Sequence, residues 1–377
     1  MSAWPGKYVI GLTGNIATGK SVVRKMLEHQ GAYGIDADAL AHRAIARGAP
    51  GYQPVVETFG KWMLKPDQQI DRGRLGRVVF SDPEALKLLE AILHPLVREA
   101  VDVLVQHARQ AAVVLEAIKL LEGPLRSACD SIWVTYASPQ VQLARLVEKR
   151  VMHPEAAQQR IRAQPPQEAK LAAADVVIRN EGSFEDTWRQ VQAGWQEIFP
   201  TQAQVEPVAP VAAEGHFAVE RAGPRQADEI AAFITRTSRG RRSLNRAGVM
   251  EAFGEKAFLL LKSGGKLVGL VGWQVENLVS RTSDVFLEPG LSLDKALLVL
   301  LEEVELASRE LQCEAILLFL PPNLARHESA WRALRYELRT VQELAVGAWQ
   351  EAAIESQPSG TVLLFKQLRK DRVLRPV

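Results

Sequence analysis

A glycine-rich loop near the start of the chain constrains the fold more than any other feature. Residues 14–21 (GNIATGKS) match the phosphate-binding pattern G-x-x-x-x-G-K-[ST], with an apolar run before them and a helical pattern from about Lys20. Small residues let the backbone curl so that successive N–H groups point at one anion, and the following helix adds the positive end of its dipole. The loop therefore predicts a nucleotide-phosphate site where a strand meets a helix. Its predicted contacts are Gly14, Ala17, Thr18, Gly19, Lys20, Ser21 and Val22, with Lys20 on the β- and γ-phosphates and Ser21 on Mg²⁺.

Strand-like and helix-like segments alternate through the first half of the chain. Short apolar runs that suit buried parallel strands precede segments with helical periodicity, and several of these begin at a proline, as the first turn of a helix allows. The alternation predicts a doubly wound α/β domain with a parallel sheet. The predicted strands are 8–13, 32–35, 111–118, 131–137 and 175–178. The predicted helices are 20–30, 83–93, 95–109, 139–150, 154–164 and 183–198.

Composition excludes several classes of protein. The chain has 377 residues, and its 46 Lys and Arg nearly balance its 44 Asp and Glu, which argues against a nucleic-acid binder. The two cysteines, Cys129 and Cys313, are too few for a disulfide framework and favour a reducing compartment. Since no apolar run reaches about 18 residues and the start lacks a signal-peptide core, we expect a cytoplasmic protein without a membrane partner. Composition does not predict the oligomeric state.

A change in composition and periodicity after the first half of the chain predicts a second domain. Residues 200–215 (PTQAQVEPVAPVAAEG) show neither helical nor strand periodicity and are typical of an extended linker, the alternative being a long loop inside one domain. We therefore expect domains at 1–199 and 216–377. The second has an α+β order, with strands predicted at 216–221, 257–262, 266–276, 284–287, 314–320 and 361–367. Its predicted helices are 225–236, 293–310 and 327–335.

Two groups of charged residues are candidates for chemistry. Asp36 and Asp38 directly follow the second predicted strand, whose carboxyl end faces the ligand crevice of a doubly wound sheet. Acids there can accept a proton from an acceptor hydroxyl or help to hold Mg²⁺, although one of them could instead cap the next helix. Arg145 and Lys149, one turn apart and followed by Arg150, predict a lid that neutralises phosphoryl charge. The alternative for the lid is a solvated helix face.

The first half resembles the dephospho-coenzyme A kinase family over about residues 7–195. The matching segments occur in order and combine the glycine-rich loop with a double aspartate and a His-Pro pair. They are 10–14 (IGLTG), 35–38 (IDAD), 48–50 (GAP), 59–60 (FG), 70–72 (IDR), Leu75, 79–80 (VF), 93–96 (LHPL), 145–146 (RL), 160–161 (RI), Gln164, 174–178 (ADVVI), Asn180 and Gly182.

The resemblance implies a P-loop kinase that transfers phosphate from ATP, with Mg²⁺, to the ribose 3′-hydroxyl of dephospho-coenzyme A. This is the last step of coenzyme A synthesis. It further implies a helical acceptor-binding region at about 50–107 and a lid at about 145–164. The implied catalytic residues are Asp38 as the base, Lys20, Arg145 and Lys149. The implied acceptor-binding residues are Thr13, Asp36, Arg72 and His94, and Asn180 is expected near the adenine.

The sequence departs from the family pattern at several positions. Val22 stands where the loop usually continues with Thr, so a hydroxyl near the α-phosphate is lost. His42 stands where Arg usually follows the alanine after the double aspartate, and Arg43 comes next. Lys149 stands where the lid usually carries Arg, and Arg150 comes next, so a bidentate donor is lost or displaced by one residue. Residues 118–122 (IKLLE) stand in place of Pro-Leu-Leu-Phe-Glu.

The second half resembles the GNAT acetyltransferase fold more weakly. Residues 219–222 (VERA), 226–230 (QADEI) and 265–273 (GKLVGLVGW) are similar to its first strand, first helix and strand pair, and Tyr336 follows the last predicted helix. The glycine-rich turn that holds the coenzyme pyrophosphate is replaced by residues 288–295 (EPGLSLDK), where a proline and acids disfavour anion binding. We therefore expect a degenerate acetyltransferase-like module with a binding, regulatory or structural role.

Two other functions remain open at the level of sequence. One is a different small-molecule kinase on the same scaffold, and the other is a binding protein that senses a nucleotide with little transfer activity. A GTPase switch is disfavoured because no Asn-Lys-x-Asp motif occurs. The intact Lys20, Ser21 and Asp38 favour transfer over sensing.

Overall fold

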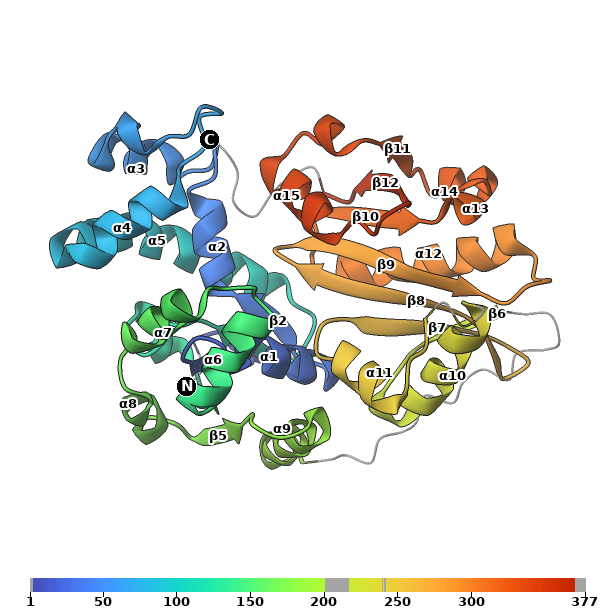
Figure 1. Cartoon of the computed structure of the whole chain (residues 1–377), viewed down its shortest axis with the longest axis horizontal. Coiled ribbons are helices and arrows are strands. Elements are labelled where there is room, and N and C mark those ends of the chain that lie inside the picture. Colours follow the sequence, from blue (N-terminus) through green and yellow to red (C-terminus); the bar gives the residue numbers. More distant parts are fainter. Residues whose placement is uncertain (1–2, 201–216, 239, 241, 370–377) are drawn as a thin grey trace.

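The computed structural model of the protein describes residues 3–200, 217–238, 240 and 242–369, and it contains two β-sheets, each with its own helices (Figure 1). The predicted linker, 200–215, falls almost wholly outside the described residues, as does the domain boundary drawn there. The first sheet is built from residues before this segment and the second sheet from residues after it.

The first sheet has five parallel strands in the order β2-β3-β1-β4-β5. A parallel sheet needs crossover connections, and helices supply them here. The elements are β1 (Tyr8–Gly14), α1 (Lys20–His29), β2 (Tyr33–Asp36), α2 (Ala37–Ala44), α3 (Tyr52–Phe59), α4 (Arg72–Ser81), α5 (Pro83–His107), β3 (Ala112–Glu116), β4 (Ser131–Tyr136), α6 (Pro139–Glu148), α7 (Pro154–Arg162), α8 (Gln167–Ala172), β5 (Val176–Arg179) and α9 (Phe184–Ile198). The predicted doubly wound class is thus confirmed.

Alternate residues of the central strands enter different cores. Ile10 and Leu12 pack with apolar residues of α1 and α9, whereas Val9 packs with residues of α2 and α5 on the other face. Burial on both faces explains why these strands read as continuous apolar runs. A separate small core joins α3, α4 and the first half of α5 beyond the edge of the sheet (Figure 1).

One predicted helix boundary is wrong. The sequence predicts helices at 83–93 and 95–109, but α5 runs without interruption over Pro83–His107 with Pro95 inside it. A proline removes one i→i−4 hydrogen bond, a loss of roughly 3 kcal/mol in a helix interior. Burial of Val97, Val101 and Leu104 against the sheet compensates for this loss, because each buried aliphatic side chain contributes about 1.5–3 kcal/mol.

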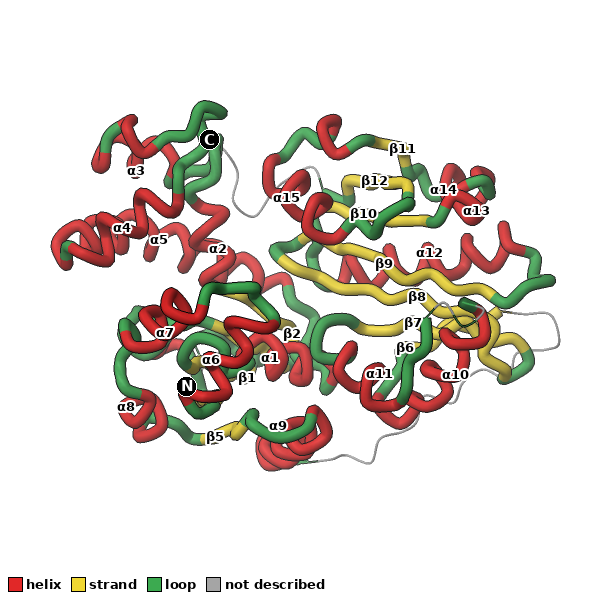
Figure 2. Tube along the Cα trace, in the orientation of Figure 1, coloured by secondary structure: helices red, strands yellow, loops and turns green. Residues whose placement is uncertain are grey.

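The second sheet has seven strands in the order β11-β12-β10-β9-β8-β7-β6. β9 and β10 are parallel, and the other neighbours are antiparallel. Figure 2 shows its long strands beside helix α12. The elements are β6 (Phe217–Arg221), α10 (Ala227–Thr237), α11 (Arg246–Ala252), β7 (Ala257–Ser263), β8 (Lys266–Glu276), β9 (Val279–Leu287), α12 (Leu293–Glu310), β10 (Ala315–Leu320), α13 (Pro322–Ala325), α14 (Glu328–Ala333), β11 (Glu337–Arg339), α15 (Gly347–Ser356) and β12 (Val362–Gln367).

Sequence reasoning located most of the longer elements but missed α11, α13, β11, α15 and the first half of β9. The β8–β9 turn is formed by Asn277 and Leu278, whose φ angles are +51° and +60°. Hairpin turns of this kind favour Asn-Gly, and a leucine with positive φ is uncommon. The turn therefore carries no recognisable signal, and β9 was predicted to begin only at 284.

The β8–β9 turn packs into the core of the first domain. Leu278 is 8% exposed and belongs to the same apolar cluster as Tyr33, Leu40 and Leu104. Beside it, Arg43 of α2 donates to the carbonyl oxygen of Asn277 at 2.7 Å. The two domains therefore share one continuous core at this point.

Polar contacts extend this interface on both sides of the turn. Arg43 Nη2 lies 2.6 Å from Oε2 of Glu314, a carboxylate that is fully buried. Lys25 Nζ donates to the carbonyl oxygen of Val275 at 2.9 Å, and Gln312 Nε2 donates to that of Leu104 at 2.8 Å. The second domain is thus fixed to α1 and α2, the helices that follow the glycine-rich loop and β2.

In the described part of the chain, none of the helices combines the length and the hydrophobicity needed to cross a membrane.

We predict that Arg43→Ala lowers the free energy of unfolding by about 3 kcal/mol, because it removes a guanidinium that is paired with the buried carboxylate of Glu314. Urea denaturation followed by circular dichroism measures the change. Arg332→Ala, which breaks the solvent-exposed pair with Glu328, is the control and should have a much smaller effect. Equal losses for the two variants would contradict the prediction.

We also predict that stability falls as the pH is lowered from 7 to 5. Burial, together with the charge of Arg221, lowers the pKa of His29 to about 4, and His29 Nε2 donates to the carbonyl oxygen of Phe253 across the interface. The unfolded chain, with an ordinary histidine pKa near 6.5, binds the proton first, so the stabilisation is present above pH 6.5 and is lost as the pH falls towards 4. The expected loss at pH 5 is about 2 kcal/mol. His29→Gln should flatten the pH dependence of the urea midpoint, and an unchanged slope would contradict this assignment.

Candidate active site

The glycine-rich loop has a conformation that only glycine tolerates at two of its positions. Gly14 and Gly19 have φ angles of +154° and +93°. A Cβ atom on Gly14 would lie 2.3 Å from Thr135 Oγ1, and one on Gly19 would lie 1.9 Å from Asn180 Nδ2. The neighbouring strands β4 and β5 thus press against the loop, and the absence of side chains keeps it open to a phosphate.

Lys20 and Ser21 begin α1 directly after the loop. Lys20 Nζ donates to the carbonyl oxygens of Gly14 and Asn15 at 3.1 and 3.3 Å, so the ammonium group lies over the loop. Burial lowers the pKa of Lys20, while the charges of Glu116 and Asp38 oppose this shift. Ser21 Oγ donates to Glu116 Oε1 at 2.9 Å.

Glu116 is a site residue that sequence reasoning missed. It ends β3, next to β1, and its second oxygen accepts from Arg24 Nε at 2.7 Å. The residue is 4% exposed. Its signal was available: a lone acid inside the apolar run 111–118 falls where a parallel strand ends, and such ends face the ligand crevice.

Asp38 and Asp36 point to different neighbours, as their spacing predicts. Asp38 Oδ2 accepts from the backbone N–H of Ile118 at 2.9 Å, and Asp36 Oδ1 caps α2 by accepting from Ala39 N at 2.8 Å. Burial raises the pKa of Asp38, while the charge of Lys20 lowers it. Burial and the negative charge of Glu116 raise the pKa of Asp36. Asp36 is therefore a helix cap, the alternative considered from the sequence, and its acceptor-binding role stays a prediction.

A second lysine, which sequence reasoning missed, lies on the same side of the sheet. Lys170 of α8 is 4% exposed, and its Nζ donates to the carbonyl oxygen of Ile118 at 2.9 Å. Thr13 Oγ1 donates to the same oxygen at 3.1 Å. Burial lowers the pKa of Lys170, with smaller influences from Lys20 and Asp38. Its sequence surroundings, a short polar helix, gave no signal, because the packing of α8 against β1 and β4 is what places it here.

The predicted lid contacts the loop directly. Arg145 Nη1 donates to the carbonyl oxygen of Ala17 at 3.1 Å, and its Nη2 donates to that of Asn180 at 2.7 Å. Gln164 Oε1 accepts from Ile16 N at 2.6 Å. The segment between α6 and α8 thus covers the loop from one side.

Two other residues of the predicted site make structural contacts. Asn180 donates from Nδ2 to the carbonyl oxygen of Thr18 at 3.0 Å and accepts from Thr187 Oγ1, so its amide ties β5 to the loop. Lys149 turns to the second domain, where its Nζ lies 3.1 Å from Glu251 Oε1, and the structure does not bring it to the loop. The charge of Arg150, in contrast, contributes to lowering the pKa of Lys20. The catalytic role of Lys149 and the adenine contact of Asn180 stay predictions.

The acceptor-side residues and Val22 are spread over several elements. Arg72 begins α4 and is half-exposed, with Nη2 4.0 Å from Glu351 Oε2 of the second domain. His94 is exposed on α5.

Val22 packs beside Phe184 and Gly254. Because the second domain covers this position, an apolar side chain suits it where the family has Thr.

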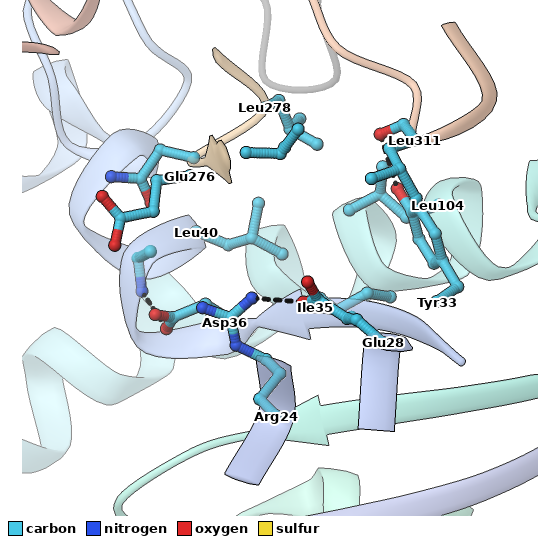
Figure 3. A pocket seen from close by; sticks show the side chains of 14 residues that line it. Arg24, Glu28, Tyr33, Ile35, Asp36, Leu40, Leu104, Glu276, Leu278 and Leu311 are labelled. Carbon is cyan, nitrogen blue, oxygen red and sulfur yellow. Dashed lines mark hydrogen bonds and ion pairs between the residues drawn. The ribbon is translucent and has the colours of Figure 1, made fainter. Parts of the chain in front are cut away.

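Arg24, Glu28 and Asp36 also line a cavity of about 160 Å³ between the domains (Figure 3). Arg24 Nη1 lies 2.7 Å from Glu28 Oε1, and Lys25 Nζ lies 2.9 Å from Glu28 Oε2. Although burial opposes it, Lys25 and Arg24 lower the pKa of Glu28 to about 2. Glu276 and Leu278 of the second domain form the opposite wall (Figure 3).

The strand order, the glycine-rich loop with Lys20 and Ser21, and the acids at the ends of β2 and β3 together define a P-loop kinase. A family model for dephospho-CoA kinase matches residues 8–186. A curated dephospho-CoA kinase of Geobacter metallireducens is 44% identical over 192 residues, covering 50% of this chain and 96% of that protein. The chain therefore belongs to the dephospho-CoA kinase family, and the activity implied by the sequence resemblance is confirmed at this level.

Solved structures are similar to each half separately. The dephospho-CoA kinase from Campylobacter jejuni is 28% identical, with a TM-score of 0.35. The match spans 51% of this chain and 97% of the Campylobacter chain. The PaiA N-acetyltransferase from Thermoplasma acidophilum, solved with coenzyme A, is 10% identical, with a TM-score of 0.31, and covers 40% of this chain and 99% of that one. Acetyltransferase neighbours of this kind cover the C-terminal region.

The segment before α12, where the sequence lacks the coenzyme-binding turn, is occupied by internal ion pairs. Glu288 pairs with Arg236 at 3.0 Å and lies 3.8 Å from Lys266 Nζ. Glu288 is thus engaged by two cations of the second domain. The degenerate character of this acetyltransferase-like module stays a prediction.

We predict that Gly19→Ala weakens ATP binding at least tenfold, because the added Cβ would collide with the Asn180 amide that holds the loop. Gly31→Ala is a matched control: Gly31 also has a positive φ, +106°, but a Cβ there has no atom within 4 Å. Fluorescence titration with an ATP analogue measures both. Gly31 lies outside the loop, so Gly31→Ala should bind ATP normally, and equal affinities for the two variants would contradict the prediction.

Proposed function

We propose that this chain phosphorylates the 3′-hydroxyl of dephospho-coenzyme A with Asp38 as the base and Lys20 on the transferred phosphate. The observation that supports this is the placement of a half-buried carboxylate in the first turn of α2 and a buried ammonium at the start of α1, close enough that the charge of each shifts the pKa of the other. β3, which lies between β1 and β2, adds Glu116.

The proposed reaction transfers the γ-phosphoryl group of ATP to the 3′-oxygen of dephospho-coenzyme A. The 3′-oxygen forms a bond to the γ-phosphorus of ATP, and the bond between that phosphorus and the β,γ-bridging oxygen breaks. The electron pair of the broken bond leaves on ADP, and the proton of the 3′-hydroxyl passes to the Asp38 carboxylate. In this proposal Arg145, which donates to the carbonyl oxygen of Ala17 in the loop, neutralises charge on the phosphates.

Burial makes Asp38 a better base than an ordinary aspartate. It raises the pKa of Asp38, so the carboxylate has more affinity for the acceptor proton, while the Ile118 N–H and the charge of Lys20 oppose this rise in pKa. The Ile118 N–H fixes the direction of the carboxylate.

The residues present fit a Mg²⁺ ion. Ser21 Oγ and Glu116 Oε1 are hard oxygen donors 2.9 Å apart at the start of α1. Among the described residues, no group of three or more His, Cys, Asp or Glu is arranged to hold a metal alone. Mg²⁺ commonly binds one or two protein oxygens together with substrate phosphates, and Ser21 and Glu116 would hold it in this way. When bound, the ion neutralises phosphate charge.

The location we propose for this reaction is the cytoplasm. Cys129 and Cys313 are both free thiols, and a reducing compartment preserves such thiols.

We predict that Asp38→Asn lowers kcat by 10²- to 10⁴-fold and leaves ATP affinity nearly unchanged, because the amide cannot accept the proton. Detection of the 3′-phosphorylated product by mass spectrometry measures turnover. Asp82→Asn, which changes the N-cap of α5, is the control for an Asp-to-Asn change at a helix start.

Two outcomes would contradict this assignment. Turnover retained in Asp38→Asn would remove Asp38 from the mechanism. ATP binding by the unmodified chain, with no product from dephospho-coenzyme A, would favour the nucleotide-sensing alternative.

A further inference from the structure

A large cavity between the domains opens one helical turn from Asp38. Its volume is about 570 Å³, and His42 on α2 is one of the residues that line it. Four residues along a helix correspond to a rise of about 6 Å, so His42 lies on the same side of α2 as Asp38. The cavity therefore adjoins the position proposed for the acceptor ribose.

The wall contributed by the first domain carries a net positive charge, although Asp67 also lines it. Arg47 and Arg72 both line it. Arg47 Nη1 donates to the carbonyl oxygen of Asp67 at 3.3 Å. A guanidinium has five N–H donors, and this bond uses one of them. Burial and the charge of Arg72 lower the pKa of His42, so the two arginines supply the positive charge. A wall of this kind suits a phosphate group.

The wall contributed by the second domain comes from β9 and α15, and it includes a buried unused donor. The Arg281 side chain is 6% exposed, and its Nη1 bonds Ser356 Oγ at 2.8 Å and lies 3.3 and 3.5 Å from Glu276 and Glu355. Its Nε is buried and, within the described part of the chain, has no hydrogen-bond partner. An unsatisfied buried N–H of this kind points to a missing acceptor.

Asp67, Glu351 and Glu355 are the acids among the described residues that line the cavity, and Glu351 of α15 is the one that pairs with Arg72. Its Oε2 lies 4.0 Å from Arg72 Nη2, and the side chains of Glu351 and Arg72 are 52% and 50% exposed. The charge of Glu351 also opposes the lowering of the His42 pKa. An exposed pair at this distance is weak, whereas a bidentate arginine–phosphate pair is strong. A phosphate that enters the cavity can therefore displace Glu351 from Arg72.

We propose that the second domain forms the outer wall of the acceptor site and that Glu351 competes with the pyrophosphate of dephospho-coenzyme A for Arg72. The inference rests on the proposed function, since it is the 3′-hydroxyl at Asp38 that directs the pyrophosphate of the same nucleotide towards this cavity. Glu351 is then a specificity-determining residue: it weakens the binding of ligands whose phosphate must displace it from Arg72, and it does not affect ligands that carry no phosphate.

The test is Glu351→Gln in the full chain. Removal of the competing charge should lower the KM for dephospho-coenzyme A about three- to fivefold, while kcat and the KM for ATP stay unchanged. The effect should shrink at high salt, because it is electrostatic and partly exposed. Glu328→Gln is the matched control: Glu328 is 55% exposed, pairs with Arg332 at 2.7 Å on α14 of the same domain, and should leave the KM for dephospho-coenzyme A unchanged.

A second measurement keeps this inference separate from the proposed function. Calorimetric titration of dephospho-coenzyme A gives its Kd whether or not turnover occurs, and Glu351→Gln should lower that Kd by the same factor. The Kd of adenosine, which has no pyrophosphate, should not change. If the Kd falls in Glu351→Gln but the unmodified chain shows no turnover, the proposed kinase reaction is rejected. The inference that Glu351 competes for Arg72 at the acceptor site is then still supported. A Kd and KM for dephospho-coenzyme A that are unchanged or raised in Glu351→Gln would overturn the inference.

Discussion

The carboxylate of Glu116 is the interaction on which the rest of the site depends. It ends the strand between β1 and β2, and its two oxygens accept from Ser21 at the start of α1 and from Arg24 one turn later. One buried side chain thus sets the direction of the helix whose first turn carries Lys20. A buried acid is tolerable only when it is paired, and Arg24 supplies the pairing, so the charge pattern of α1 follows from the chemistry at the end of β3.

The same pairing reaches the second domain through α1. Arg24 also pairs with Glu28, Glu28 pairs with Lys25, and Lys25 donates to a backbone carbonyl of β8. The turn after β8 then inserts Leu278 into the kinase core. The second domain is therefore in contact with both helices that carry the proposed chemistry, through α1 on one side and the Arg43–Glu314 pair on α2 on the other. This arrangement gives the part of the chain beyond the kinase a physical connection to the kinase reaction.

Much of the kinase half could be predicted from the sequence, because its signals are local. The five strands of the first sheet, the loop at 14–21 and the position of Asp38 all depend on patterns that span a few residues. Glu116 and Lys170 were missed, since an acid in an apolar run and a lysine on a short polar helix acquire meaning only when neighbouring strands and helices place them beside Lys20 and Asp38. The helix break expected at Pro95 was wrong because packing against the sheet outweighs the lost hydrogen bond.

The sequence by itself determined the class of the first domain and the identity of its phosphate-binding and acidic residues, because glycine spacing and strand ends are properties of short segments. Tertiary structure alone decided the partners of those residues. It turned Lys149 towards Glu251 and placed Glu351 of α15 opposite Arg72 across the cavity between the domains. Glu351 and Arg72 lie far apart in the chain, and no local pattern encodes such a contact. It arises because the β8–β9 turn and the buried Arg43–Glu314 pair fix the second domain against α2.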